Sequence, residues 1–409
     1  MSLTITDDTN DDGLLSSAEL SGQVNYQVAL GAGTALGDTL VIVDQDGNEL
    51  FNGAVTQAML DNGLSLAVDA PADGQTLTLT ATVTDPAGNS DSASDSVTVD
   101  SHTPNAPTVL IVDDGTPGDG LLTQGEIDGN GAGVQLTVSI DAEDFSAGGH
   151  VNLTIVNGTA TSNVELKLVN DELQFANGTP ATGYSYNATT GVISWTETAP
   201  GEGQSITVTA TQTDKAGNTS AEGTDTALVD TAAPNAPTVL IVDDGTPGDG
   251  LLTQGEIDGN GAGVQLTVSI DAEDFSAGGH VNLAIVNGTA TSNVELKQVN
   301  GELQFADGTA ATGFTYSNGT ISWTEAAPAN GQGITVTATQ TDKAGNTSAE
   351  GTDTALVDTA APNAPTVLIV DDGNPGDGLL TQGEIDGNGA GVQLTVSIDA
   401  EDFSAGGHV

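Results

Sequence analysis

Apolar and polar residues alternate with a period of two along much of the chain. The run 134–140 reads Val-Gln-Leu-Thr-Val-Ser-Ile, and the runs 77–83 and 206–210 alternate in the same way. Successive side chains of a strand point to opposite faces, so this pattern predicts strands with one buried face. Clusters of Gly, Asn and Asp separate the runs and predict turns, and no convincing helical pattern appears. The sequence therefore predicts an all-β fold.

The chain also repeats itself. The segment Pro-Asn-Ala-Pro-Thr-Val begins at Pro104, Pro234 and Pro362, which gives spacings of 130 and 128 residues, and a shorter first unit matches the second at an offset of 106 residues. Units of this size are typical of single immunoglobulin-like sandwiches. We therefore predict tandem immunoglobulin-like antiparallel β-sandwich domains in an extended rod. The predicted segments are a short-type repeat at 1–103, long-type repeats at 104–233 and 234–361, and the N-terminal part of a further, truncated repeat at 362–409.

The long units contain an insertion that the first unit lacks. Residues 164–175 alternate around a short polar break, and the counterpart of that break in the next unit is Asn300-Gly301. Asn-Gly is the strongest short signal for a two-residue hairpin turn. We predict an inserted β-hairpin, which could account for much of the difference between 106 and 130 residues.

The charge of the chain narrows its possible partners. There are 57 acidic residues, four lysines and no arginine, for a net charge of −53. Nucleic acids and anionic membranes are excluded as natural partners because binding phosphate requires Lys or Arg. No stretch approaches 18 continuous apolar residues, so direct membrane insertion is not expected. Two interpretations of the acidity remain open, namely solubility in a salty habitat and the binding of divalent cations.

The first acidic segment matches a calcium-loop pattern. Residues 8–19 fit D-x-[DN]-x-[DN]-G-x5-E at every specified position. Calcium takes six to eight oxygen ligands, and a glycine at the sixth position permits the sharp turn. The predicted ligands are Asp8, Asn10, Asp12, the backbone carbonyl of Leu14, and Glu19. The alternative is an acidic turn between two strands.

The later units carry a degraded version of this loop. It is one residue longer, and no Asp or Asn lies between its second and third acidic residues. A calcium site is still predicted in each copy. The candidate ligands are Asp113, Asp114, Asp119 and Glu126; Asp243, Asp244, Asp249 and Glu256; and Asp371, Asp372, Asp377 and Glu384.

Two further acidic features recur at the predicted domain edges. One is a linker aspartate, at Asp100, Asp230 and Asp358, and the other is the Asp-x-Ala-Gly-Asn turn that begins at Asp214 and Asp342. In a seven-stranded sandwich the first and last strands run in the same direction. The acidic loop of one domain, the linker and the turn of the next domain should therefore meet, and a calcium ion shared there would bridge the two domains. The alternative for the second feature is an ordinary turn between strands.

These motifs, in this order, resemble the immunoglobulin-like extender repeats of large repeats-in-toxin (RTX) and biofilm-associated bacterial adhesins. The matching text is the acidic loop that ends Leu-Leu-x-x-x-Glu, the run at 201–210, Thr-Asp-x-Ala-Gly-Asn, and Val-Asp-x-x-x-Pro-x-Ala-Pro. It covers essentially the whole chain. The resemblance implies type I secretion, a bacterial cell-surface location and calcium-dependent rigidity. The family's Gly-Gly-x-Gly-x-Asp array and any recognisable ligand-binding domain are missing from this sequence.

Enzymatic chemistry is not expected. No nucleophile elbow, P-loop, dinucleotide fingerprint or histidine metal cluster appears. The absence of cysteine suits a bacterial exported protein that is stable without disulfides. The predicted function is that of a calcium-rigidified extender that projects a distant adhesive region, whose ligand the sequence does not identify. The alternative is a carbohydrate- or protein-binding module whose repeats act by avidity, for which Tyr184, Tyr186 and Trp195 are the candidate aromatics.

Overall fold

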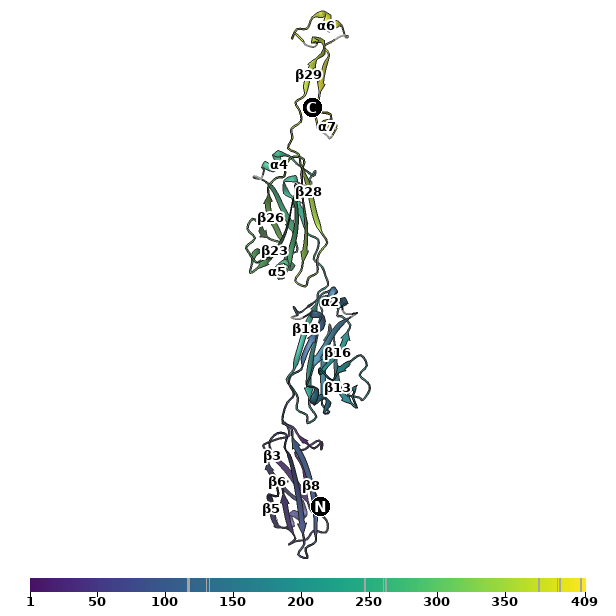
Figure 1. Cartoon of the computed structure of the whole chain (residues 1–409), viewed down its shortest axis with the longest axis vertical. Coiled ribbons are helices and arrows are strands. Elements are labelled where there is room, and N and C mark those ends of the chain that lie inside the picture. Colours follow the sequence, from purple (N-terminus) through teal and green to yellow (C-terminus); the bar gives the residue numbers. More distant parts are fainter. Residues whose placement is uncertain are drawn as a thin grey trace. The chain divides into compact units, whose positions relative to one another are not determined.

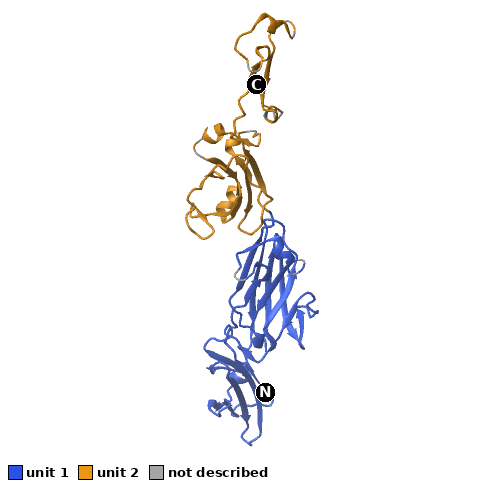
Figure 2. Ribbon diagram, turned by 45° about the horizontal axis from the view of Figure 1, so that its top comes forward, with its two compact units in different colours: residues 1–232 blue, residues 233–409 orange. Residues whose placement is uncertain are grey.

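The computed structural model describes the chain except for residues 116–117, 130, 132, 246–247, 260, 262, 374–375, 388, 390 and 405–406. The described residues form two compact units, Met1–Ala232 and Ala233–Val409 (Figure 2). The first unit contains two β-sandwiches, and the second contains one sandwich and a further strand pair. The predicted all-β, immunoglobulin-like fold is confirmed, with short helices in some of the loops.

The first sandwich packs a sheet of order β1-β3-β6 on a sheet of order β2-β8-β7-β4-β5 (Figure 1). Burial alternates along its strands, so that Val24, Tyr26 and Val28 are buried while their neighbours in β3 are exposed. Side chains of both sheets form a single core. The elements are β1 (Ser2–Ile5), β2 (Leu14–Leu15), β3 (Gln23–Ala29), β4 (Thr39–Val43), β5 (Glu49–Ala54), α1 (Gln57–Asn62), β6 (Leu64–Asp69), β7 (Thr76–Thr84) and β8 (Ser90–Val99).

The second sandwich packs a sheet of order β15-β16-β11-β9 on a sheet of order β10-β18-β17-β12-β13-β14. Its core is separate from that of the first sandwich and includes Phe145, Leu153 and Trp195. The elements are β9 (Thr108–Ile111), η1 (Val112–Asp114), β10 (Leu121–Leu122), α2 (Gln124–Gly129), β11 (Val134–Ser139), α3 (Ala142–Ser146), β12 (His150–Asn157), β13 (Ala160–Val169), β14 (Glu172–Phe175), β15 (Ser185–Asn187), β16 (Val192–Glu197), β17 (Ser205–Thr213) and β18 (Gly223–Val229).

The third sandwich has the same topology, with sheets of order β19-β21-β26-β25 and β20-β28-β27-β22-β23-β24. Residues 188–191 join β15 to β16, whereas only residues 318–319 join β25 to β26, and this difference explains the spacings of 130 and 128 residues. The elements are β19 (Thr238–Ile241), η2 (Val242–Asp244), β20 (Leu251–Leu252), α4 (Gln254–Gly259), β21 (Val264–Ser269), α5 (Ala272–Ala277), β22 (His280–Asn287), β23 (Ala290–Val299), β24 (Glu302–Phe305), β25 (Thr315–Ser317), β26 (Thr320–Glu325), β27 (Gly333–Thr341) and β28 (Gly351–Val357).

The first strand of each sandwich crosses from one sheet to the other. β1 pairs antiparallel with β3, whereas β2, after the acidic loop, pairs parallel with β8. At the crossing the Ile5 N–H donates to the carboxylate of Asp95 at 2.8 Å, in place of a bond to a neighbouring strand. The same 2.8 Å bond joins Ile111 to Asp225 and Ile241 to Asp353. Within the otherwise antiparallel sheets of the three sandwiches, β2, β10 and β20 each make a two-residue parallel pair.

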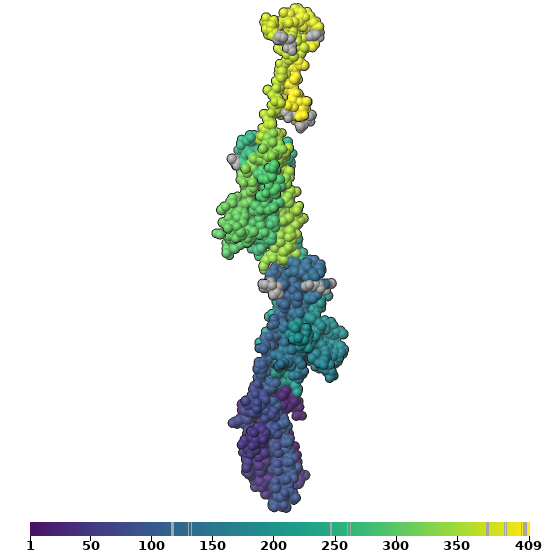
Figure 3. All heavy atoms as spheres, in the orientation of Figure 1, coloured from purple at the N-terminus to yellow at the C-terminus, as the bar shows by residue number. Residues whose placement is uncertain are grey.

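The inserted hairpin predicted from the sequence is confirmed. β13 and β14 pair antiparallel from Leu166↔Phe175 to Val169↔Glu172. The turn between them needs positive φ at both positions, and Asn170 (50°) and Asp171 (64°) adopt it. The region of the hairpin, teal in Figure 3, bulges from the side of the second sandwich. This insertion lengthens the six-stranded sheet by an edge strand.

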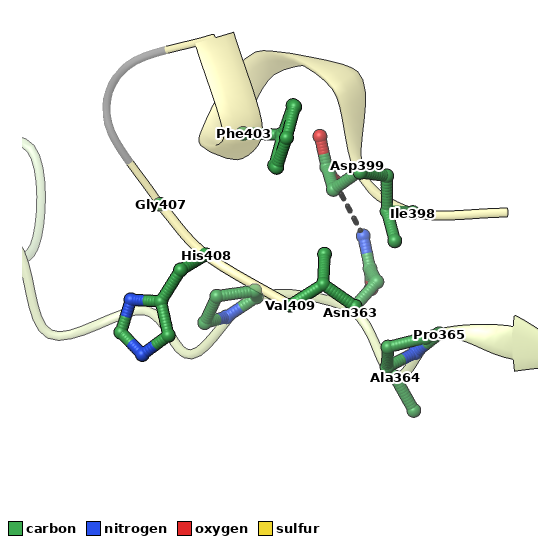
Figure 4. A pocket seen from close by; sticks show the side chains of 10 residues that line it. Asn363, Ala364, Pro365, Ile398, Asp399, Phe403, Gly407, His408 and Val409 are labelled. Atoms are coloured by element: carbon green, nitrogen blue, oxygen red, sulfur yellow. Dashed lines mark hydrogen bonds between the residues drawn. The ribbon is translucent and has the colours of Figure 1, made fainter. Parts of the chain in front are cut away.

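Residues 362–409 form β29 (Thr366–Ile369), η3 (Val370–Asp372), α6 (Gln382–Gly387), β30 (Leu394–Ser397) and α7 (Ala400–Ser404). β29 and β30 pair antiparallel, as β9 and β11 do. Val367 is 64% exposed, whereas its counterpart Val109 is 7% exposed within a complete sandwich. Phe403 faces an open hollow beside Asn363, which donates to Asp399 at 3.1 Å (Figure 4). Phe145, the counterpart of Phe403, is fully buried in the second sandwich, where β12 and the later strands complete the core.

Candidate metal sites

The first acidic loop, between β1 and β2, holds its predicted ligands close together. The carboxylate of Asp8 accepts hydrogen bonds from the N–H groups of Asp12 (3.1 Å) and Gly13 (2.9 Å). Asp12 accepts from the Leu14 N–H at 2.8 Å and from the Asn10 side-chain amide at 3.0 Å. Gly13 has a φ of 81°, the conformation that the sharp turn requires. Four of the five predicted ligands are therefore linked through one hydrogen-bonded turn.

Glu19, the fifth predicted ligand, is engaged by donors of the loop itself. One carboxylate oxygen accepts from the Thr9 N–H (3.2 Å) and hydroxyl (2.8 Å), and the other from the Ser16 N–H (3.0 Å) and hydroxyl (2.9 Å). Burial alone would raise the pKa of Glu19, but these hydrogen bonds outweigh it and lower the pKa. These four hydrogen bonds use about all the acceptor sites that a carboxylate offers, so a cation at Glu19 would have to replace some of these donors.

The longer loops reproduce most of this arrangement. Asp114 accepts from the N–H groups of Asp119 (3.1 Å) and Gly120 (3.0 Å), and Asp119 accepts from Leu121 at 3.0 Å. Asp114 thus takes the place of Asp8, and Asp119 that of Asp12. Burial raises the pKa of Asp114, and the charges of Asp119 and Asp225 add to the effect despite the hydrogen bonds from Gly120 and Asp119. The same bonds recur at Asp244 and Asp249. In the last copy, Gly378 donates to Asp372 and Leu379 donates to Asp377.

The first aspartate of each longer loop has a different position. Asp113 is buried, and its carboxylate accepts from the N–H of Gln135, in β11, at 2.7 Å. Asp243 and Asp371 bond in the same way, at 2.7 Å, to Gln265 and Gln393. These three aspartates anchor the loop to the following strand, as Asp7 does through Asn25 in the first sandwich (2.7 Å). A part for them in metal binding stays a prediction.

The glutamate of each longer loop forms a helix capping box. The Thr123 N–H donates to Glu126 at 2.9 Å, its hydroxyl donates to the same oxygen at 2.8 Å, and the Glu126 N–H approaches that hydroxyl at 3.3 Å. Such reciprocal bonding satisfies the free amides at the start of a helix, here α2. Glu256 and Glu384 are bonded in the same way to Thr253 and Thr381. The Thr-x-x-Glu spacing could have indicated these short helices from the sequence.

The turn, linker and loop that were expected to meet at a domain junction do meet at the first one. Asn218, in the turn between β17 and β18, accepts from the Ser17 N–H at 2.8 Å and donates to the Asp100 carbonyl oxygen at 2.8 Å. Asp214 fixes Asn218 in place by accepting from its N–H and its side-chain amide, both at 2.8 Å. Asn218 is only 2% exposed. The second sandwich is thereby bonded both to the end of the acidic loop and to the linker of the first.

Several carboxylates crowd this junction. Burial raises the pKa of Asp100, and the charges of Asp214 and Asp73 raise it further. Burial also raises the pKa of Asp144, in the first turn of α3, and the charges of Asp141 and Asp214 contribute. Asp144 and Asp73 were not predicted as site residues, although the Asp-Ala-Glu-Asp-Phe segment that contains Asp144 recurs at 271–275 and 399–403 and could have indicated it. A cation at this junction would offset the neighbouring carboxylate charges that, after burial, raise both pKa values.

The corresponding residues of the other units keep their local geometry. The N–H groups of Asp100, Asp230 and Asp358 donate to the carbonyl oxygens of Leu15, Leu122 and Leu252 at 2.9–3.0 Å, which places each linker aspartate beside its acidic loop. Asp342 accepts from the Asn346 N–H (2.8 Å) and side-chain amide (3.0 Å), like Asp214 with Asn218. Within the described residues no group of three acidic or histidine side chains converges as a ready metal site. The donors are carboxylate and carbonyl oxygens, the ligand type that calcium takes.

Two parts of the chain match the model of a known protein family. The Calx-beta domain model matches residues 123–184 and 253–320, equivalent stretches of the second and third sandwiches. No curated protein sequence gives a significant match. Within the described ranges, no helix is both long and apolar enough to cross a membrane.

Many solved structures are similar to the chain, and two of them come from large bacterial adhesion proteins. One belongs to a 1.5-MDa bacterial ice-binding adhesin studied for host cell surface retention, with 19% identity over 88% of this chain and 97% of that chain and a TM-score of 0.32. The other is a tetra-tandem repeat in the extending region of a large adhesion protein, with 19% identity over 90% of this chain and 76% of that chain and a TM-score of 0.29. The resemblance to adhesin repeats is thus also found among solved structures, and at these values it assigns no function.

Proposed function

We propose that this chain is a calcium-rigidified extender segment of a giant secreted bacterial adhesin of the RTX or biofilm-associated kind. Its repeats would stand at the cell surface and project a distal ligand-binding region for adhesion or biofilm formation. The chain itself would perform no catalysis. Its partners would be calcium ions and neighbouring repeats of the same chain.

The observation that carries this proposal is the first junction. Asn218 joins two sandwiches by direct hydrogen bonds, and the charge of Asp214 adds to burial in raising the pKa of both Asp100 and Asp144. Neutral side chains would serve a passive linker better, because like charges at a joint push the two domains apart. A divalent cation would convert that repulsion into attraction to a common ion.

Sequence and family comparison support the same role for calcium. The Calx-beta model matches two of the repeats, and that family binds calcium. Asp100, Asp230 and Asp358 recur at equivalent positions, so one mechanism could operate at each junction. Asp8, Asn10, Asp12 and Glu19 would hold a further ion within the first sandwich, and calcium would supply charge neutralisation there as well.

The alternative function, a carbohydrate-binding module, is not favoured because its candidate aromatic residues pack in or against the core of the second sandwich. Trp195 is 6% exposed and packs on Tyr184, with ring centroids 5.4 Å apart, and its indole N–H donates to Glu197 at 3.1 Å. Burial, followed by the charge of Glu197, raises the pKa of Tyr184 to about 12. Tyr186 packs on Phe145 at 5.0 Å. These aromatics belong to the interior of the sandwich.

Calcium titration calorimetry of the metal-free full chain tests the proposal. Binding should appear with dissociation constants of roughly 0.1–1 mM, the extracellular class of sites. The double variant Asp100→Asn with Asp144→Asn should lose part of the binding heat. Asp46→Asn, which removes one exposed acid in the turn between β4 and β5, is the control outside the junction and should bind as the wild type does. Equal binding by the double variant and the control would exclude the junction site, and no binding at all would exclude calcium.

A further inference from the structure

Asn-Gly pairs recur in this chain, and their surroundings differ in ways that matter for chemical stability. An asparagine followed by glycine can deamidate because the glycine carries no side chain to hinder attack by its own backbone nitrogen. That nitrogen must first lose its proton and then approach the asparagine side-chain carbon. A glycine N–H that is donated to a carbonyl oxygen must break that bond before it can react.

Most of the described pairs are protected in this sense. The glycine amides of Asn157-Gly158, Asn287-Gly288 and Asn330-Gly331 donate to Ser205, Gly333 and Val357 at 2.8–2.9 Å. The side-chain amides of Asn157 and Asn287 also donate at 2.8 Å, to the carbonyl oxygens of Thr198 and Ala326. Both reacting groups of these two pairs are therefore fixed.

The pair Asn300-Gly301 lacks the hydrogen bonds that protect those pairs. It forms the two-residue turn between β23 and β24, with φ of 52° and 83°, and both residues are exposed. Among the described residues, neither the Asn300 side chain nor the Gly301 N–H has a hydrogen-bond partner. A side chain added at Gly301 would meet nothing within 4 Å, so the turn is open on that side. Asn318-Gly319 forms a similar turn, but Gly319 is buried against the Ile270 backbone.

We propose that Asn300 is a site of spontaneous deamidation in the folded protein. The deprotonated Gly301 nitrogen attacks the Asn300 side-chain carbon Cγ, a C–N bond forms, the bond from Cγ to Nδ2 breaks, and ammonia leaves. Water then opens the resulting succinimide. Opening at the side-chain carbonyl gives aspartate, and opening at the main-chain carbonyl gives isoaspartate, which adds one carbon to the backbone of the turn. Either product adds one negative charge.

The modification is specific to one repeat. The equivalent turn of the second sandwich is Asn170-Asp171, where the aspartate side chain hinders the attack and φ is 64°. Gly301→Asp therefore recreates a turn that the same fold already accommodates. It is the matched variant for the test, and Asn287 in the same molecule is the internal control.

The experiment is peptide mapping by mass spectrometry after prolonged incubation of the full chain in mildly alkaline buffer. Asn300 should convert about tenfold faster than Asn287, the factor that one net hydrogen bond on the glycine amide supplies. In concentrated urea the two rates should become similar, and Gly301→Asp should suppress conversion at residue 300. Equal rates for Asn300 and Asn287 in the folded chain would overturn the proposal. So would an intact Asn300 in folded protein under conditions that convert it in urea.

Discussion

Asn218 donates its side-chain amide to the carbonyl oxygen of Asp100 at 2.8 Å, and these two residues belong to different sandwiches. The same asparagine accepts from the Ser17 N–H at 2.8 Å. In the first sandwich the equivalent turn has the same internal bonds, from Asn89 to Asp85, but Asn89 is exposed. A turn whose internal bonds are complete on their own thus gains a second role at the first junction, where it bonds the preceding sandwich.

Asn218→Ala should loosen the first junction. It removes both bonds to the first sandwich, each worth about 0.5–1.5 kcal/mol net. Hydrogen exchange of the Ser17 amide is the direct readout, because that amide loses its acceptor and should exchange faster. Asn89→Ala, which removes the same side chain from the equivalent, exposed turn of the first sandwich, should leave Ser17 unchanged. Equal protection of Ser17 in the two variants would show that the junction bonds do not form in solution.

Asp225→Ala should weaken the crossing of the first strand in the second sandwich. It leaves the Ile111 N–H without its 2.8 Å acceptor, at a cost of about 1–3 kcal/mol. Asp225→Asn keeps a carbonyl oxygen that can accept the same bond and should cost less. Exchange of the Ile111 amide, followed together with urea unfolding, distinguishes the two variants. If both variants behave alike, the bond contributes little.

The sequence predicted the sandwiches well because each strand buries only one face. Apolar and polar residues therefore alternate along the strand, as in the run from Val134 to Ile140. It predicted the hairpin because Asn300-Gly301 specifies a turn type. It did not predict that Asp225 accepts from Ile111, because residues 114 positions apart leave no local pattern. Nor did it predict the helix at 124–129, since the Thr123-x-x-Glu126 capping box overlaps the expected closing ligand of a calcium loop.

Glu19→Ala should destabilise the first sandwich even in chelator. Both oxygens of Glu19 accept from Thr9 and Ser16, and removing such an acceptor costs about 1–3 kcal/mol. If Glu19 is also a calcium ligand, the variant should in addition lose the gain of roughly 1.4 kcal/mol expected at ten times the dissociation constant. Melting in calcium and in chelator separates the two effects. An equal calcium gain in wild type and variant would remove Glu19 from the ligand set.

The pH dependence of the metal-free chain should reflect Asp100 and Asp144. Burial, followed by neighbouring carboxylate charges, raises both pKa values above 3.8. A carboxyl group with a raised pKa binds more protons in the folded state, so its contribution to stability is fully present below pH 3.8 and is lost as pH rises through the raised value. In chelator, the melting temperature of the double variant Asp100→Asn with Asp144→Asn should therefore fall less than that of wild type as the pH rises from 4 to 7. Identical losses would contradict the crowding inferred at the junction.

The central claim is that calcium stiffens the joints between repeats, and small-angle X-ray scattering of the full chain in calcium and then in chelator tests it most directly. Ordinary salt screens charges over about 8 Å at 0.15 M and should reproduce only part of the effect, so both conditions are measured at equal ionic strength. The account predicts that chelation increases flexibility and changes the maximum dimension, and that Asp100→Asn with Asp144→Asn reduces this response. Identical scattering in calcium and in chelator would contradict it.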